Sequence, residues 1–236
     1  MCLWIVVTTC QAQMSVQKPG FRYSRRIDET TPITDQKTGK RISMKEYSQL
    51  IQQDPYAYHL VANYNEYGQP ASYLLRPTTP EEHETRQIRD RDPARQPQAG
   101  QAIAPFSMKG LDEKIYRSAD LMGNVVVLCF LISLDRPFWG DKQTDMLTDA
   151  LKPYQSETGP VVLGVMISEQ LKNADQLNTK ALPFVPVLDG HGFHIKYDIV
   201  SIPTFVVIDK AGKVAANLQG PGSYEKLKQT LTTLTR

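Results

Sequence analysis

Apolar runs alternate with helix-patterned segments in the second half of the chain. The apolar runs are Val125–Ile132, Val161–Ile167, Thr204–Asp209 and Val214–Leu218. The first two are continuous, which is typical of strands buried on both faces of a sheet. Apolar residues at helical spacing predict helices over Asp141–Leu151, Glu169–Lys180 and Ser223–Leu234. The order β-α-β-α-β-β-α predicts a mixed α/β sandwich.

The first half of the chain predicts a small α+β unit over residues 14–76. Ser43 and Glu46 have the spacing of a capping box, and the apolar positions after them predict a helix over Met44–Gln52. Two strand-like runs and a hairpin turn follow, at Tyr58–Tyr64, Ala71–Leu75 and Asn65–Gly68. One helix and one hairpin make a marginal core, so we expect this unit to dock on its neighbour or on a partner.

Residues 77–100 separate the two halves and predict a linker. They contain four prolines and nine Asp, Glu and Arg residues, but few apolar side chains. Such a segment buries too little apolar surface to offset the entropy lost on ordering. The predicted organisation is a signal segment at 1–13, the α+β unit at 14–76, the linker at 77–100 and an α/β domain at 101–236.

Charge excludes one large class of partner. The 236 residues include 27 Lys and Arg against 25 Asp and Glu, a net charge of +2. Binding to a phosphate backbone requires a clear basic excess. We therefore expect no nucleic-acid partner.

The first residues resemble the end of an export signal. Leu3–Val7 is apolar, and Cys10-Gln11-Ala12 fits a small-x-small cleavage site. Val7-Thr-Thr-Cys10 also resembles a lipoprotein box, in which Cys10 would carry a lipid anchor. These features predict an exported protein of the periplasm or cell envelope. A cytoplasmic protein with an accidental apolar start is the alternative.

The three cysteines cannot form a disulfide framework. Cys2 and Cys10 lie in the first segment, and Cys129 lies inside the apolar run Val125–Ile132. A cysteine in such a run is usually a small buried apolar side chain with an inert thiol. An unusually reactive thiol is the alternative at this position.

The second half of the chain resembles the thioredoxin superfamily. The resemblance is carried by the order of elements together with Ser201-Ile-Pro-Thr-Phe-Val-Val-Ile-Asp-Lys-Ala-Gly-Lys213, and it extends from Gln98 to Arg236. It is closest to the redoxin branch, which includes the TlpA/ResA-type thiol-disulfide oxidoreductases and the AhpC/TSA group. The resemblance implies a thioredoxin-like α/β/α sandwich with a mixed central sheet. It also implies that Pro203 is a cis-proline and that Ile202, Pro203 and Thr204 border a groove for an extended segment.

The residues that perform the family's thiol chemistry are missing. Aligned on Phe130, the family's Cys-x-x-Cys positions fall on Asp135 and Phe138. A peroxidase-type alignment places the reactive cysteine on Trp139 and the accompanying threonine on Arg136. Cys129 occupies the position of the family's buried carboxylate. Because thiol exchange requires a thiolate, the sequence predicts no catalytic residue in this turn.

Asp135, Arg136, Pro137, Phe138 and Trp139 therefore have another predicted role. Because Asp135 precedes Pro137, it is expected to cap the start of the following helix. Phe138 and Trp139 are expected either to pack inward or to present an apolar patch beside Ile202.

Metal and cofactor sites are not predicted. His191 and His194 stand near Asp189, but glycines surround them, so we expect solvated loop histidines rather than metal ligands. The sequence contains no phosphate-binding glycine loop and no His-Glu-x-x-His motif.

Three functional hypotheses follow. The first is an exported, redox-inactive protein that binds a peptide or partner protein at the groove of Asp135–Trp139 and Ile202–Thr204. The second is a redoxin-family oxidoreductase or antioxidant that uses Cys129 or a partner's thiol. In the third, the functional contact is made by a tyrosine cluster of the N-terminal unit, namely Tyr56, Tyr58, Tyr64, Tyr67 and Tyr73.

Overall fold

The computed structural model describes residues 27–88, 90–154, 156, 159–168, 181–220 and 222–235. The predicted signal segment, with Cys2 and Cys10, and the predicted helix Glu169–Lys180 lie outside these residues.

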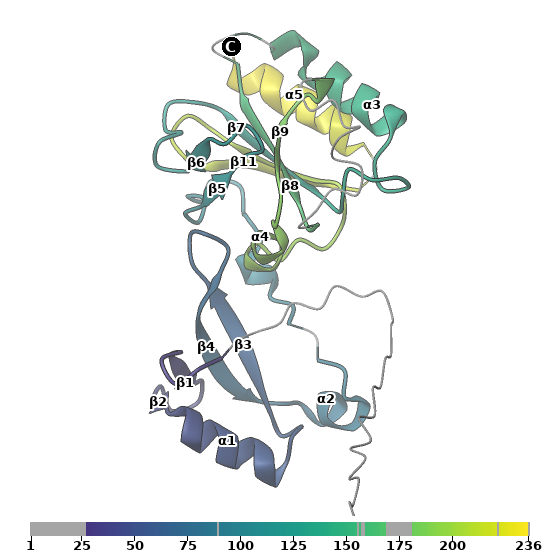
Figure 1. Ribbon diagram of the computed structural model, residues 1–236. Helices are drawn as coiled ribbons and strands as arrows, with labels where there is room; N and C mark the ends of the chain where they lie inside the picture. The colour runs from purple at the N-terminus through teal and green to yellow at the C-terminus, as the bar shows by residue number, and fades with distance from the viewer. Residues whose placement is uncertain are drawn as a thin grey trace, which may run out of the picture.

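A mixed five-stranded sheet forms the centre of the C-terminal domain, in the order β11-β10-β7-β8-β9 (Figure 1). Its strands are β7 (Val126–Leu131), β8 (Val161–Met166), β9 (Val185–Val187), β10 (Thr204–Ile208) and β11 (Val214–Gln219). β7, β8 and β9 are parallel, whereas β10 is antiparallel to both β7 and β11. The predicted thioredoxin-like sandwich with a mixed sheet is confirmed.

Alternating side chains of β7 face two separate cores. All six residues of the strand are buried. Val127, Cys129 and Leu131 pack with side chains of α3 (Asp141–Leu151) and α5 (Ser223–Leu234), whose bounds are those predicted. The other three residues pack with α4 (His191–Lys196) and with β5 (Ser107–Lys109). The continuous apolar run is thus explained by a strand covered on both faces.

The remaining elements of this domain are short. β5 pairs with β6 (Ile115–Arg117) in a two-stranded hairpin, and a 3-10 turn, η2 (Lys152–Tyr154), follows α3.

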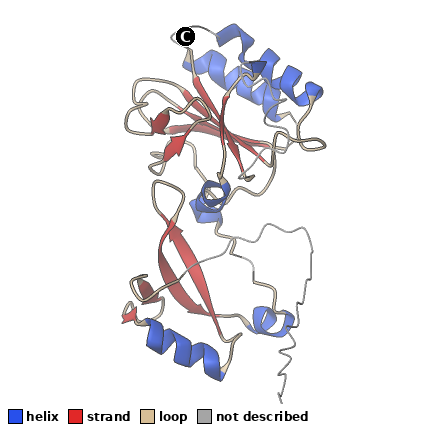
Figure 2. Cartoon of the chain, in the orientation of Figure 1, coloured by secondary structure: helices blue, strands red, loops and turns tan. Residues whose placement is uncertain are grey.

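The N-terminal unit is a four-stranded sheet with a helix on one face (Figure 2). Its strands are β1 (Ile33–Asp35), β2 (Arg41–Ile42), β3 (Tyr58–Tyr64) and β4 (Pro70–Pro77), in the order β2-β1-β4-β3. The helix is α1 (Met44–Gln53), and the predicted capping box of Ser43 and Glu46 is present at its start. Gly68 has φ +69° in the β3–β4 turn, which confirms the predicted hairpin.

The tip of the β3–β4 hairpin docks on α4 of the C-terminal domain (Figure 1). The Asn65 carbonyl oxygen accepts a hydrogen bond from Lys196 Nζ at 2.9 Å, and the Glu66 carbonyl oxygen accepts one from the Ser107 amide at 2.7 Å. A Cβ atom added to Gly192 would lie only 1.7 Å from the Gly68 carbonyl oxygen. The two backbones therefore meet at a distance that glycine alone permits.

Residues 77–100 contain more structure than their composition predicts. α2 (Pro80–Thr85) begins with a capping box of Thr79 and Glu82, and a 3-10 turn, η1 (Pro93–Arg95), follows. Arg76 forms a bidentate pair with Glu82 at 2.7 and 2.8 Å. Capping and charge pairing thus stabilise a short helix within the predicted linker, which apolar burial would not.

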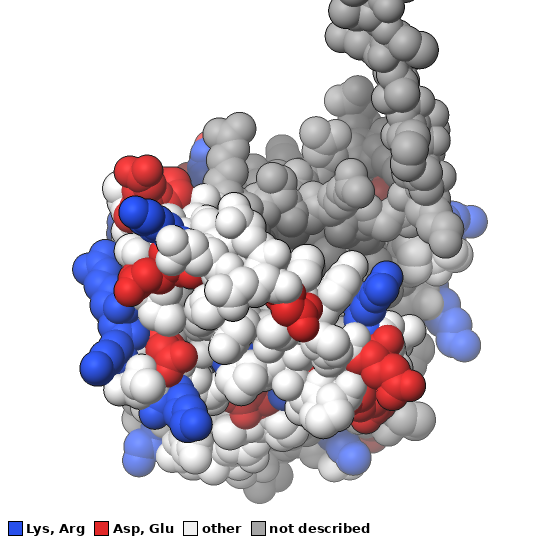
Figure 3. Space-filling model, turned by 90° about the horizontal axis from the view of Figure 1, so that it is seen from below, with Lys and Arg blue, Asp and Glu red and all other residues white. Residues whose placement is uncertain are grey.

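Positive and negative side chains are interspersed on the face of the molecule shown in Figure 3. Among the described residues, no helix has the length and hydrophobicity needed to span a bilayer.

Candidate functional site

The two segments predicted to form the groove lie at the same end of the central sheet. Thr204, the first residue of β10, pairs with Phe130 near the end of antiparallel β7. The chain therefore enters β10 where it leaves β7. The Ile202–Pro203 peptide is cis, as predicted for Pro203. Thr204 is buried, and its Oγ1 donates a hydrogen bond to the Ser201 carbonyl oxygen at 2.6 Å.

The turn after β7 is not the start of a helix. The amides of Phe138 and Trp139 both donate to the Asp135 carbonyl oxygen, at 3.0 and 3.2 Å, which closes a single turn. α3 begins only at Asp141. The Asp135 carboxylate accepts a hydrogen bond from Ser133 Oγ at 2.8 Å instead of capping the helix. The predicted capping role of Asp135 is therefore wrong. The amides that would donate hydrogen bonds to its carboxylate already donate to its carbonyl oxygen within the turn.

This turn contains two further features. The Arg136–Pro137 peptide is also cis. Arg136 and Pro137 are exposed, and Arg136 Nη2 lies 3.3 Å from Asp141 Oδ2. Such an exposed pair contributes little to stability.

The two aromatic residues of the turn have opposite environments. Trp139 is 5% exposed, and its ring meets that of Phe184 edge to face at 5.5 Å between centroids. Phe138 is 54% exposed. On the other side of the predicted groove, Ile202 is 36% exposed and Val200 is 43% exposed. Trp139 thus packs inward, whereas Phe138 leaves apolar surface exposed on the same turn.

Cys129 is enclosed in the sheet. Its side chain has no exposed surface, and its neighbours across the strands are Phe205 and Gly164. Burial raises the pKa of the Cys129 thiol far above its usual range. A thiol that is both protonated and covered cannot attack a substrate without local unfolding. The expected burial of this cysteine is confirmed.

The two histidines before the cis-proline loop lie in α4, not in a loop. Gly190 brings this helix close to β8, because a Cβ atom there would lie 2.5 Å from Val165 Cγ1. His194 is buried, and its Nε2 lies 3.0 Å from the Val165 carbonyl oxygen. Burial lowers the pKa of His194 to about 4. His191 is half-buried, so the expectation of solvated loop histidines is wrong. No cluster of three metal-ligating side chains occurs among the described residues.

The five tyrosines of the N-terminal unit do not form one exposed surface. Tyr73 is buried in the core of the unit, and Tyr58 and Tyr64 pack against that core. Tyr56 and Tyr67 are exposed, and the Arg86 guanidinium lies 4.7 Å from the centre of the Tyr56 ring. The tyrosines thus act mainly in packing.

Sequence reasoning missed Asp198, a buried carboxylate at the start of the cis-proline loop. Asp198 is 5% exposed and has φ +44°. It accepts hydrogen bonds from Arg91 Nε at 2.7 Å, from Arg91 Nη2 at 3.3 Å and from Gln96 Nε2 at 3.1 Å. A single acidic residue in a predominantly apolar stretch was the available signal, because a buried charge requires a partner.

Comparison with known proteins bears on the C-terminal domain. Residues 99–217 match the family described as the AhpC/TSA family. No relative among curated proteins matches the chain.

Several solved structures match part of the chain. The thioredoxin domain of a thiol-disulfide oxidoreductase from Bacteroides vulgatus is 19% identical, with 57% of this chain and 98% of that chain covered and a TM-score of 0.46. The exposed lipoprotein thioredoxin of Streptococcus pneumoniae is 26% identical, with 56% and 100% covered and a TM-score of 0.41. StoA from Bacillus subtilis is 24% identical, with 55% and 98% covered and a TM-score of 0.42.

Proposed function

Because the chain belongs to the AhpC/TSA family, we propose that it is a redoxin-fold protein without thiol chemistry of its own, which binds an extended peptide segment of a partner protein. The proposed groove lies between the turn Asp135–Trp139 and the loop Ile202–Thr204. The observation that carries this proposal is the combination of a cis-proline loop flanked by exposed apolar side chains with a turn that contains no cysteine.

The absence of thiol chemistry is supported by the position of Cys129. It is the only cysteine between residues 11 and 236, and it is fully buried in β7. The turn after β7 has an aspartate and a phenylalanine at the two positions where the family's cysteines would stand. A carboxylate and a phenyl ring cannot form a mixed disulfide with a substrate.

The binding role is supported by exposed apolar residues in the turn after β7 and in the segment before Pro203. Phe138, Val200 and Ile202 offer apolar surface to a ligand, while buried Trp139 and Thr204 are fixed in the domain beneath them. Covering apolar surface contributes roughly 25 cal/mol per Å². A strand-like peptide could combine such apolar contacts with main-chain hydrogen bonds to the loop, a recognised mode of peptide binding.

Fluorescence anisotropy of short, fluorescein-labelled apolar peptides tests this function. We expect F138A and I202A each to weaken binding by about tenfold, the effect of removing a residue central to an interface. The matched control is I115A, because Ile115 is equally apolar and exposed but lies in β6. Absence of binding by the unaltered protein, or equal effects of all three substitutions, would overturn the proposed groove.

An activity assay tests the redox part separately. We expect the protein not to accelerate the reduction of insulin disulfides or the turnover of peroxide. Acceleration that disappears in C129S would favour an oxidoreductase that uses this cysteine. Acceleration that persists in C129S would show that some other group reacts.

The place of action is also part of the proposal. The apolar run Leu3–Val7 and the small residues around Cys10 support export to the periplasm or cell envelope, with a lipid on Cys10 as one form of attachment. Mass spectrometry of the amino terminus of protein purified from cells tests this point. Cleavage after Ala12 or acylation of Cys10 is the expected result, and an intact Met1 end would contradict it.

A further inference from the structure

The stretch Arg91–Pro97 of the linker contacts Asp198. This residue begins the segment that leads to the cis-proline Pro203. Arg91 and Gln96 both donate hydrogen bonds to the Asp198 carboxylate, and Gln96 Nε2 also donates to the Asp198 carbonyl oxygen at 3.2 Å. Asp198 is buried while Arg91 is half-exposed. Because a buried carboxylate without partners is costly, Asp198 depends on these linker residues for its place in the fold.

The same stretch reaches the middle of the loop by a second path. The Pro97 carbonyl oxygen accepts a hydrogen bond from Asn217 Nδ2 at 3.2 Å. Gln219 Nε2 donates to Asn217 Oδ1 at 3.3 Å, and Ser201 Oγ donates to Gln219 Oε1 at 3.2 Å. A chain of side chains on β11 therefore connects the linker to Ser201, two residues before Pro203.

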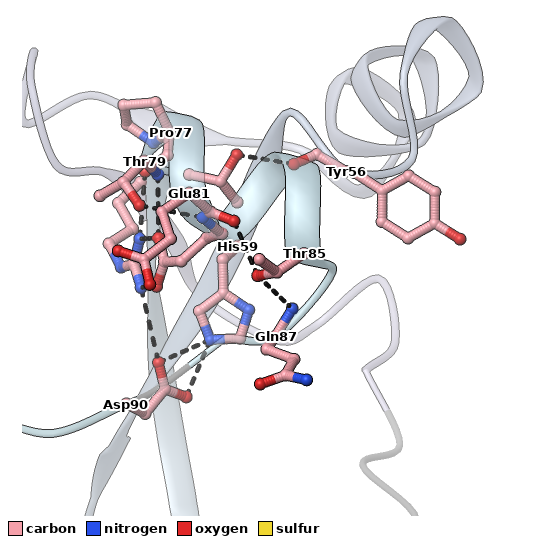
Figure 4. A network of polar contacts seen from close by, with 11 residues as sticks. Tyr56, His59, Pro77, Thr79, Glu81, Thr85, Gln87 and Asp90 are labelled. Carbon is pink, nitrogen blue, oxygen red and sulfur yellow. Dashed lines mark hydrogen bonds and ion pairs between the residues drawn. The ribbon is translucent and has the colours of Figure 1, made fainter.

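The other end of the stretch is fixed to the N-terminal unit. Asp90, next to Arg91, contacts His59 of β3, with 2.7 Å between His59 Nε2 and Asp90 Oδ1. His59 and Asp90 point toward each other (Figure 4), and Arg76 Nη2 lies 4.0 Å from Asp90 Oδ1. The N-terminal unit, the linker and the loop are thus connected by contacts between neighbouring side chains.

We propose that the stretch Arg91–Pro97 positions the cis-proline loop, so that docking of the N-terminal unit controls the shape of the groove. Asp198 follows α4 with a positive φ, and its backbone is held locally by hydrogen bonds from the Asp198 amide to the Ile195 carbonyl oxygen at 3.1 Å and from the Ile199 amide to the His194 carbonyl oxygen at 2.9 Å. The linker acts on its side chain. Release of Arg91 and Gln96 leaves the buried Asp198 carboxylate without these hydrogen bonds, which destabilises the start of the loop. What the groove binds rests on the function proposed above, whereas the positioning of the loop does not.

Hydrogen exchange in the free protein tests the positioning without any ligand. We expect R91Q to accelerate exchange of the amides of residues 199–202 by at least about tenfold, because local opening becomes easier. The amides of the β5–β6 hairpin are expected to keep their rates. The matched control is R117Q, which removes an exposed arginine that pairs with Asp120 at 3.4 Å. Unchanged exchange at residues 199–202 in folded R91Q would overturn the proposal.

Peptide affinity tests the control of the groove. We expect R91Q and D198N each to weaken binding of the labelled apolar peptides by about tenfold. The double variant is expected to weaken binding by little more than either single substitution, because both substitutions break the same contact. If D198N does not fold, the peptide affinities of R91Q and Q96A are compared with that of the unaltered protein instead. Peptide binding that R91Q and Q96A leave unchanged would overturn the coupling. Faster exchange at residues 199–202 in R91Q with no peptide binding by the unaltered protein would support the positioning and overturn the proposed ligand.

Discussion

Asp90 and Arg91 are adjacent in the linker, and their side chains bind opposite parts of the molecule. Asp90 pairs with His59 of the N-terminal unit at 2.7 Å, and Arg91 pairs with Asp198 of the C-terminal domain, also at 2.7 Å. A segment whose composition predicts a free tether is thus attached at two successive residues. The N-terminal unit is consequently attached through specific side-chain contacts of the linker as well as through the hairpin tip.

Cys129 is predicted to be unreactive in the native protein. Because it is fully buried and burial raises the pKa of its thiol, iodoacetamide is expected to modify it about a thousandfold more slowly in the native state than in guanidinium chloride. Peptide-level mass spectrometry distinguishes this cysteine from Cys2 and Cys10. Equal rates of modification in the native and unfolded states would contradict the burial.

Trp139 and Phe138 are predicted to differ sharply in their contribution to stability. W139A removes a buried ring that packs on Phe184, so the free energy of unfolding is expected to fall by about 3–5 kcal/mol. F138A changes an exposed side chain and is expected to alter the free energy of unfolding by no more than about 0.5 kcal/mol.

Urea unfolding followed by circular dichroism measures both values. Since the two residues are adjacent, each variant serves as the control for the other. A large loss of stability in F138A would show that Phe138 packs in the core, which would remove the apolar surface proposed for the groove.

The main elements of the C-terminal domain could be predicted because their signals are local and repeated. β7 and β8 are continuous apolar runs, and the apolar residues of α3 and α5 recur at helical spacing. β9 has only three residues and its middle residue is a proline, so it carries no recognisable periodicity. The helix α2 depends on the pairing of Glu82 with Arg76, a tertiary contact that composition does not reveal.

The candidate site could be predicted only in outline. The family resemblance implied the cis peptide before Pro203, and the missing cysteines are visible directly in the sequence. The separate environments of Phe138 and Trp139 could not be predicted, because they depend on a turn whose amides bond to the Asp135 carbonyl oxygen. The role of Asp198 was also out of reach, since its partner Arg91 is 107 residues away in the sequence.

G192A is predicted to disrupt docking of the N-terminal unit. A Cβ atom at this position would clash with the Gly68 carbonyl oxygen, so either the hairpin tip or α4 must shift. Overpacking of this kind typically costs about 1–3 kcal/mol. The amide of Ser107, which donates to the Glu66 carbonyl oxygen, is expected to exchange faster in G192A.

The matched control is G140A. A Cβ atom there would lie 3.6 Å from Gln143 Oε1, and its φ of −166° suits any residue. Unchanged exchange of Ser107 in G192A, or the same increase in G140A, would contradict the close contact between the two backbones.

His194 is predicted to make the protein less stable in mild acid. Burial lowers the pKa of His194 to about 4 from the ordinary 6.5, so the unfolded chain binds more protons than the folded protein between these values. The stabilising contribution is therefore complete above pH 6.5 and is lost as the pH falls toward 4. The expected loss is on the order of 2–3 kcal/mol.

The measurement is the free energy of unfolding in urea for the unaltered protein and for H194Q, at pH 7 and at pH 4. Glutamine keeps a hydrogen-bond donor near the Val165 carbonyl oxygen but does not titrate in this range. The decrease between the two pH values is expected to be smaller in H194Q. Equal decreases in the two proteins would show that His194 is not the group responsible.

The contact between Gly68 and Gly192 also provides a way to recognise relatives with the same architecture. Neither position tolerates a side chain while the hairpin tip rests on α4, because a Cβ atom on Gly68 would lie 2.9 Å from the Phe193 ring and one on Gly192 would overlap the Gly68 carbonyl oxygen. Homologues that keep both glycines retain the structural condition for the docked N-terminal unit. Homologues in which Gly192 is replaced must shift the hairpin tip or α4, so the pair offers a two-residue signature for tracing this arrangement.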